Sequence, residues 1–182
     1  MALLRKALSF TVLLVAGPGL AAQGVQAPEY QVKAVFLFNF AQFVDWPPQV
    51  VPDSQAPLII GILGHDPFGG ILDVTVRGER RGPRPFEVRR YQRVEDIKAC
   101  DILFISQSEN DGLEEILLSL KNQPILTVSD SPRFAERGGM IHLVTERNRI
   151  RLKINLRAVQ AANLTISSKL LRVAEIVGPT GR

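Results

Sequence analysis

Three polar loops each follow a short apolar run, and each carries side chains that could contact a ligand. The candidate ligand-binding residues are His65, Asp66, Ser106, Ser108, Ser129 and Asp130. Open parallel sheets bind ligands beyond the carboxyl ends of their strands, which is where these loops would lie. Imidazole, hydroxyl and carboxylate groups at that edge could hold a small polar solute.

Enzymatic interpretations of the same loops are incomplete. Ser106 or Ser129 could join His65 and Asp130 in a hydrolase triad, but no nucleophile-elbow pattern surrounds either serine. Residues 64–70 have the outer spacing of a phosphate loop, yet no lysine and hydroxyl pair ends them, and no dinucleotide fingerprint is present. We therefore expect a binding protein with no catalytic residues and no cofactor.

Metal and disulfide chemistry are also poorly supported. The two histidines, His65 and His142, are far apart in sequence and have no spaced carboxylate companions, so no metal site is expected. Cys100 is the only cysteine, which excludes a disulfide within the chain. We expect Cys100 to be a buried structural residue beside the apolar run 102–105.

The N-terminus has the features of a secretory signal peptide. Arg5 and Lys6 precede an apolar run at 7–16, which glycine and proline interrupt well short of the roughly 20 residues that a membrane-spanning helix needs. Small residues follow, so we predict a signal peptide at residues 1–22 with cleavage between 21 and 24. The mature protein would then work outside the cytoplasm, in the periplasm, with no direct insertion into the membrane.

The remaining chain has the size of one domain, which we place at residues 28–178. Removal of Arg5 and Lys6 lowers the formal net charge from +4 to +2. Seven arginines between positions 77 and 93 form a basic block, but the interleaved aromatic residues that stack on bases are missing. Nucleic acid is therefore not an expected partner.

Apolar runs and helical segments alternate along the chain. The expected strands are 58–63, 86–91, 102–106 and 124–129, and the expected helices are 30–44, 68–72 and 113–120. Residues 30–44 are apolar around most of the circumference, which predicts a largely buried helix that Pro47 and Pro48 stop. Asp66 would cap the helix at 68–72. The alternation predicts an α/β fold with a mostly parallel sheet flanked by helices.

The C-terminal third predicts a β-hairpin and two terminal helices. Residues 140–145 and 149–156 flank a short polar turn, and the second run alternates strictly between apolar and polar side chains. Its inward residues would be Ile150, Leu152, Ile154 and Leu156, and its outward residues Arg149, Arg151, Lys153 and Asn155. Helices are expected at 157–164 and 167–177, the second capped by Ser167 or Ser168.

Several segments together resemble the YfiR family. Residues 33–47 resemble its opening helix, residues 126–130 and 134–141 its central block, and residues 149–156 and 164–174 its C-terminal signature. The resemblance implies a periplasmic α/β protein, often a homodimer, that binds the periplasmic sensory domain of an inner-membrane diguanylate cyclase and holds it inactive. Release would raise cyclic di-GMP and favour biofilm. Redox-sensitive members use disulfides, which Cys100 alone cannot form within the chain.

The C-terminal segment is the predicted partner-binding surface. Its candidate contact residues are Gln160, Ile166, Lys169, Leu170, Leu171, Arg172 and Val173. The apolar members could equally close the hydrophobic core, and both uses are expected within the set. The alternative function is a periplasmic solute-binding or envelope accessory protein that acts with a transporter or histidine kinase through the three polar loops.

Overall fold

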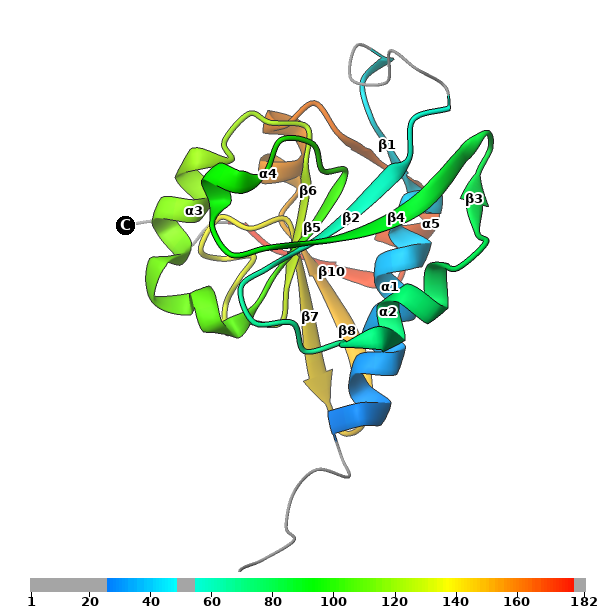
Figure 1. The fold of residues 1–182 in the computed structure, drawn as a ribbon. Coiled ribbons are helices and arrows are strands. Elements are labelled where there is room, and N and C mark those ends of the chain that lie inside the picture. Colours follow the sequence, from blue (N-terminus) through cyan, green and yellow to red (C-terminus); the bar gives the residue numbers. More distant parts are fainter. Residues whose placement is uncertain (1–25, 49–54, 179–182) are drawn as a thin grey trace, which may run out of the picture.

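The computed structural model describes residues 26–48 and 55–178, which build a twisted eight-stranded sheet with helices on both faces (Figure 1). The predicted signal peptide and its cleavage site lie outside these residues. The strand order is β10-β8-β7-β6-β5-β2-β4-β3. The strands are β2 (Leu58–Leu63), β3 (Arg80–Arg81), β4 (Arg84–Tyr91), β5 (Ile102–Ile105), β6 (Leu126–Ser129), β7 (Ile141–Glu146), β8 (Arg149–Ile154) and β10 (Ala174–Ile176).

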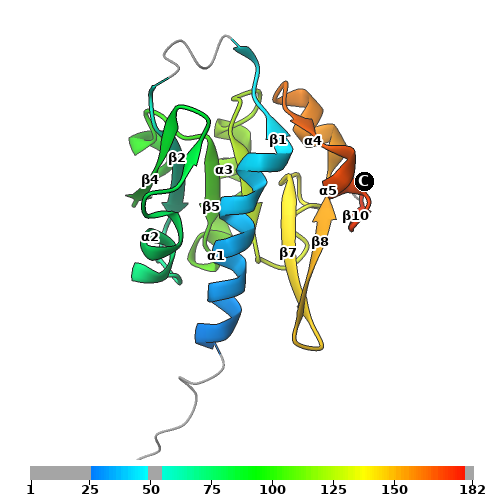
Figure 2. The same ribbon diagram turned by 90° about the vertical axis from the view of Figure 1, so that its right-hand side faces the viewer.

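The expected mostly parallel α/β fold is confirmed. Neighbouring strands are parallel except in the pairs β7–β8 and β3–β4. Figure 2 shows α1 (Gln26–Phe43) and α2 (Gly70–Val76) in front of the sheet and α3 (Leu113–Ser119) behind it. The remaining elements are α4 (Leu156–Ala161), α5 (Ser168–Leu171), the 3₁₀ turns Val94–Asp96 and Gln107–Gly112, and a small antiparallel pair of β1 (Val44–Asp45) and β9 (Thr165–Ile166).

Strand β2 lies at the point where the winding of the sheet reverses. Its chain continues through α2 to β4 on one side, whereas β5 and β6 follow in order on the other side. The carboxyl ends of β2 and β5 therefore form a topological switch point, the usual ligand position in open α/β sheets. The loops that carry His65 and Ser106 lie there.

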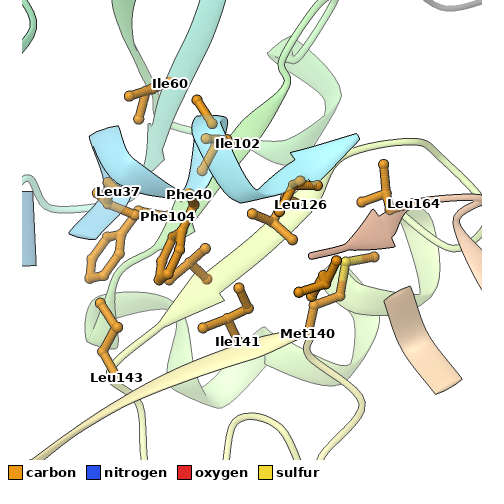
Figure 3. Close-up of a cluster of buried hydrophobic side chains, with 14 of the residues drawn as sticks. Leu37, Phe40, Ile60, Ile102, Phe104, Leu126, Met140, Ile141, Leu143 and Leu164 are labelled. Carbon is orange, nitrogen blue, oxygen red and sulfur yellow. The ribbon is translucent and has the colours of Figure 1, made fainter. Parts of the chain in front are cut away.

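The core fills both faces of the central strands. All six residues of β2 are buried, as expected for a continuous apolar run covered on both sides. On one face, Leu37 and Phe40 of α1 pack with Ile60 and Phe104 in the cluster drawn in Figure 3. A smaller cluster on the other face packs α3 and Phe134 against the sheet. Both clusters bury the apolar area that stabilises the fold.

Helix α1 is less buried than its composition predicts. Ala34, Leu37 and Phe40 are fully buried, but the side chains of Val32 and Val35 are each 47% exposed. The helix is thus largely but not wholly buried, because the sheet covers only one side of it (Figure 2). Among the described residues, no second layer packs on the outer side.

Helix α2 begins later than predicted. Gly69, not Asp66, precedes its first residue. The Asp66 carboxylate accepts hydrogen bonds from the backbone N–H groups of Phe68 at 2.8 Å and Gly69 at 3.1 Å. Asp66 thus closes the turn between β2 and α2, as short acidic side chains do in loops, without capping the helix.

The last predicted helix was also wrong in part. Ser167 caps a single turn, α5, by accepting a hydrogen bond from the N–H of Lys169 at 3.2 Å. The chain then becomes strand β10, and Ala174 to Ile176 pair in parallel with Leu152 to Ile154 of β8. Helix and strand propensities differ little over so few residues, so the free edge of β8 determined the outcome.

The β7–β8 hairpin is confirmed, with a turn of two residues. Glu146 pairs with Arg149, and Arg147 and Asn148 have φ values of 49° and 60°, the left-handed pattern of a type I′ turn. Asn155 was expected to point outward but is buried. Its side chain caps α4 by accepting from the N–H of Ala158 and donates to the carbonyl of Ala135, so burial leaves neither end of the amide unpaired.

Candidate functional site

The loops after β2 and β5 contact each other directly. The N–H of His65 donates to Oγ of Ser108 at 3.0 Å, and that hydroxyl donates to Oε1 of Glu109 at 2.7 Å. Gly64 has a φ of 85°, and a Cβ at this position would lie 2.3 Å from the same Glu109 oxygen. Only glycine allows this approach. The candidates His65 and Ser108 are therefore neighbours at the switch point, where the loops close against each other.

The other polar residues near these loops are also bonded within the fold. Asp66 pairs with Arg90 at 2.8 Å, and Arg90 also pairs with Asp73. The hydroxyl of Ser106 accepts from the N–H of Ser108 at 3.4 Å. Arg90 belongs to the basic block, and most of that block is paired with carboxylates in the same way. The pairs are Arg81–Asp45, Arg84–Asp101, Arg89–Glu87, Arg90–Asp66, Arg90–Asp73 and Arg93–Asp96.

Ser129 and Asp130 lie at the carboxyl end of β6. The Ser129 hydroxyl is fully buried, donates to the carbonyl of Ile105 at 2.6 Å and accepts from the N–H of Ser131 at 3.0 Å. The carbonyl of Asp130 accepts from Nε2 of Gln107 at 3.3 Å, which ties the β5 and β6 loops together. The structure therefore does not bring Ser129 into hydrogen bonding with His65 or Asp130.

A buried ion pair connects Asp130 to helix α1. Nζ of Lys33 lies 2.5 Å from Oδ2 of Asp130, and the two side chains are only 2% and 3% exposed. The hydroxyl of Tyr30 donates to the same oxygen at 2.8 Å. Lys33 also pairs with Glu29 one turn earlier, and Glu29 accepts from the hydroxyl of Thr145 on β7 at 2.6 Å. These contacts join α1, β6 and β7 at one corner of the molecule.

The electrostatics of this corner favour a fixed arrangement of charges. Burial and the neighbouring Asp130 carboxylate raise the pKa of Tyr30 well above its usual value, so its hydroxyl remains a neutral donor. Burial alone would raise the pKa of Glu29, but hydrogen bonds from Lys33 and Thr145 outweigh it, and the pKa lies below its usual value. One lysine between two carboxylates therefore holds α1 against the sheet.

Sequence reasoning did not identify Lys33 as a functional candidate. The available signal was its position, because Lys33 is a single charge inside an otherwise apolar helical segment and follows Glu29 by four residues. A charge in such a helix is rarely buried unless it is paired. The partner, Asp130, is 97 positions away in sequence, so only the fold reveals the pair.

His142 lies beside this corner on β7. It is buried, and its Nδ1 has no hydrogen-bond partner among the described residues. Burial lowers the pKa of His142 below its usual value, an effect that the carboxylates of Glu136 and Asp130 partly oppose and Lys153 reinforces. Within the described residues, no group of three or more histidine, cysteine or acidic side chains could hold a metal ion.

Cys100 lies at the amino-terminal ends of the parallel strands, at the edge of the sheet opposite these loops. A Cβ on Gly61 would come within 2.8 Å of its sulfur, and the thiol donates to the carbonyl of Ile102 at 3.1 Å. Burial raises the pKa of the Cys100 thiol to about 12. Cys100 was expected to be buried and is only half-buried, but its raised pKa keeps the thiol protonated at neutral pH.

The C-terminal candidates divide between core and surface. Ile166 and Leu170 are 8% and 6% exposed and belong to the main core cluster, and Leu171 packs against it. Gln160, Lys169 and Arg172 are exposed, and the side chain of Val173 is 72% exposed. The residues of this segment that a partner could reach are thus Gln160, Lys169, Arg172 and Val173.

Across residues 26–48 and 55–178, no helix combines the length and apolar character that a bilayer crossing requires. A search of curated proteins returns no match. Among solved structures, the chain is similar to the ABC domain in complex with L-Trp from Streptococcus pneumonia. The TM-score is 0.52 at 13% identity over 81% of this chain, which shows a shared fold, and the chain covers 60% of that structure's own length.

A family model matches nearly the whole described chain. The match runs over residues 30–175, from the first buried turn of α1 to β10, and its description is YfiR/HmsC-like. All the segments that resembled the YfiR family lie within this range. The suspected family is thereby confirmed. The chain belongs to the YfiR/HmsC-like family.

Proposed function

We propose that this chain inhibits a membrane-bound diguanylate cyclase by binding the cyclase's periplasmic sensory domain. Membership of the YfiR/HmsC-like family is the observation that carries this proposal. Inhibition would lower cyclic di-GMP and biofilm formation. The mechanism is linkage, because the chain would bind the inactive conformation of the sensory domain more tightly and shift the equilibrium by that difference in affinity.

The structure supports a binding role in two ways. The polar loops at the switch point bond to one another and to the backbone, with Ser108 bound to His65 and Ser129 bound to Ile105. Exposed apolar residues remain elsewhere, and Val173 is one of them. Solvent-exposed apolar side chains next to polar ones are typical of protein-binding surfaces when they cluster.

The test is made in cells of the source organism. Each diguanylate cyclase with a periplasmic domain is deleted in turn in a strain that lacks this chain, and cyclic di-GMP is measured. We expect cyclic di-GMP to rise when the chain is absent and to return to the basal level when one particular cyclase is also absent. Unchanged cyclic di-GMP after loss of the chain would refute inhibition.

Export is tested in the same strain. A version of the chain without residues 1–22 should remain in the cytoplasm, and we expect it to leave the cyclase uninhibited, whereas the full chain should be recovered in the periplasmic fraction. Inhibition by the cytoplasmic version would contradict a periplasmic contact. The solute-binding alternative predicts instead that a small molecule raises the melting temperature of the purified chain by mass action.

A further inference from the structure

A basic and apolar surface follows the outer edge of the sheet. Strand β10 is the last strand in the order, and it pairs only with Leu152 to Ile154, so Arg149 to Arg151 of β8 have no outer neighbour in the described sheet. Both Figure 1 and Figure 2 show the β7–β8 hairpin extending past the body of the sheet beside the start of α1. We call the β8–β10 edge surface the set Arg147, Arg149, Arg151 and Val173.

The basic part of this surface carries uncompensated charge. Nε of Arg151 lies 3.1 Å from Oε2 of Glu146 across the hairpin. Arg147 and Arg149 are exposed, and their side chains form no ion pair with any residue in the described ranges. Two unpaired guanidinium groups at a projecting tip favour a partner that presents carboxylates, because arginine binds carboxylates in a bidentate geometry.

The apolar part adjoins the basic part at the start of β10. Ala174 is in register with Leu152, and Val173 immediately precedes it, where Arg151 of β8 has no paired outer neighbour. The side chain of Val173 is 72% exposed. An exposed valine close to arginines matches the composition of an interface, in which apolar anchors have a polar rim.

Arg147 has an unfavourable backbone conformation at the tip of the hairpin. Its φ of 49° is unfavourable for a long side chain, and the first position of a type I′ turn normally carries asparagine, aspartate or glycine. Asn148, at 60°, suits the second position well. An arginine held in this conformation indicates a use for its side chain at the tip, since strain of this kind concentrates at functional positions.

A protective role for the same arginines is the alternative. Charged side chains and short strands prevent edge strands from pairing with other molecules, and β10 has only three residues. Glutamate would protect the edge as well as arginine does. Reversing the sign of the charge should therefore leave edge protection intact but abolish recognition of a partner.

We propose that the β8–β10 edge surface docks onto an acidic, partly apolar surface of the cyclase's sensory domain, an inference that rests on the proposed function. A second copy of the chain is disfavoured because Arg147 and Arg149 would face like charges. An anionic lipid surface is disfavoured because residues 146–149 of the tip are all polar or charged and Ile150 beneath them is half-buried, which leaves the tip without an apolar side chain to insert.

The test uses the full mature chain and the purified full-length cyclase whose output depends on the chain in cells. Inhibition of cyclic di-GMP synthesis is titrated with the wild type, with the double variant R147E/R149E and with V173D. The matched controls are R77E/R80E, which reverses two exposed arginines near α2, and V74D, where the side chain is 62% exposed. Circular dichroism checks that every variant folds.

We expect R147E/R149E and V173D to raise the half-inhibitory concentration at least tenfold and the controls to change it less than twofold. Wild-type inhibition should weaken with rising salt, and R147E/R149E should lose most of this dependence. Folded variants that inhibit like the wild type would overturn the docking surface while leaving the proposed function intact. A wild-type chain that does not inhibit the cyclase would overturn both.

Two further measurements test whether a membrane or a second copy of the chain binds the β8–β10 edge surface instead. Binding of the wild type, but not of R147E/R149E, to phosphatidylglycerol vesicles, with inhibition of the cyclase unchanged, would replace the protein partner by a membrane. Sedimentation in which the wild type is a dimer and R147E/R149E a monomer, again with unchanged inhibition, would replace it by a second copy. Either result would overturn the proposal.

Discussion

Nζ of Lys33 and Oδ2 of Asp130 lie 2.5 Å apart and join helix α1 to the end of β6 across 97 positions of sequence. Both side chains are almost completely buried. The pair sets the position of the first turns of α1 beside the hairpin, because Glu29 contacts both Lys33 and Thr145. The corner that holds the helix therefore also supports the base of the projecting hairpin.

Removal of one charge from this pair should destabilise the fold strongly. Asp130→Asn leaves Lys33 buried with only Glu29 to compensate it, and we expect a loss of about 3 kcal/mol in the free energy of unfolding. Urea denaturation followed by circular dichroism measures the change. The exposed pair of Arg81 and Asp45 provides the control, because Arg81→Met should cost less than about 1 kcal/mol.

A double replacement separates the charge effect from the packing effect. Lys33→Met with Asp130→Leu removes both charges and keeps apolar volume, so we expect it to be more stable than Asp130→Asn alone. Equal losses for the single and the double variant would show that the shape of the corner, and not its charge balance, determines stability.

The stability of the protein should fall as the pH drops below about 6.5, the usual pKa of histidine. Burial lowers the pKa of His142 in the folded state, so the unfolded chain takes up the proton first. The stability that neutral His142 contributes is fully present above the usual pKa of histidine in the unfolded chain. It is lost as the pH falls through the lower pKa of His142 in the folded protein. Urea midpoints between pH 5 and pH 8 measure this slope, which His142→Gln should reduce.

The Cys100 thiol should resist alkylation in the folded protein. Because burial raises its pKa to about 12, very little thiolate is present at pH 8. We expect modification by iodoacetamide, followed by mass spectrometry, to be at least about tenfold slower in buffer than in urea, where the thiol has its ordinary pKa. Equal rates in the two solvents would mean that the sulfur is accessible.

Replacement of Arg147 by glycine should separate stability from recognition. Glycine adopts a φ of 49° without strain, so Arg147→Gly should stabilise the fold by about 1 kcal/mol in urea denaturation. The same variant should inhibit the cyclase less well, because it lacks the guanidinium group at the tip. Asn148→Gly is the control, since its stability should change little and its inhibition not at all.

Much of the fold could be predicted from local pattern. The apolar runs at 58–63 and 102–105 are buried strands, and the alternation from Arg149 to Ile154 is a hairpin strand, because each pattern reflects how many faces of a strand are covered. The boundaries near Asp66 and Val173 could not be predicted. There, turn hydrogen bonds and an available strand edge outweigh weak local propensities.

The candidate site was predictable only as a set of loops. Polar residues after three strands indicated the carboxyl edge, and the structure places His65 and Ser108 side by side there. The sequence could not show that Ser129 bonds to Ile105, since that contact depends on the register of β5 and β6. Ile166 and Val173 look alike in sequence, and only packing distinguishes the buried residue from the exposed one.

The sequence by itself determined the family, the mostly parallel α/β class and the hairpin, because these depend on residue order and periodicity along the chain. Only the tertiary structure decided that Lys33 is buried against Asp130, that Val32 faces outward, and that β10 adds an edge strand beside residues 152–154 of β8. Each of these depends on what packs against a residue from a distant part of the chain. Burial and charge compensation are properties of that three-dimensional neighbourhood.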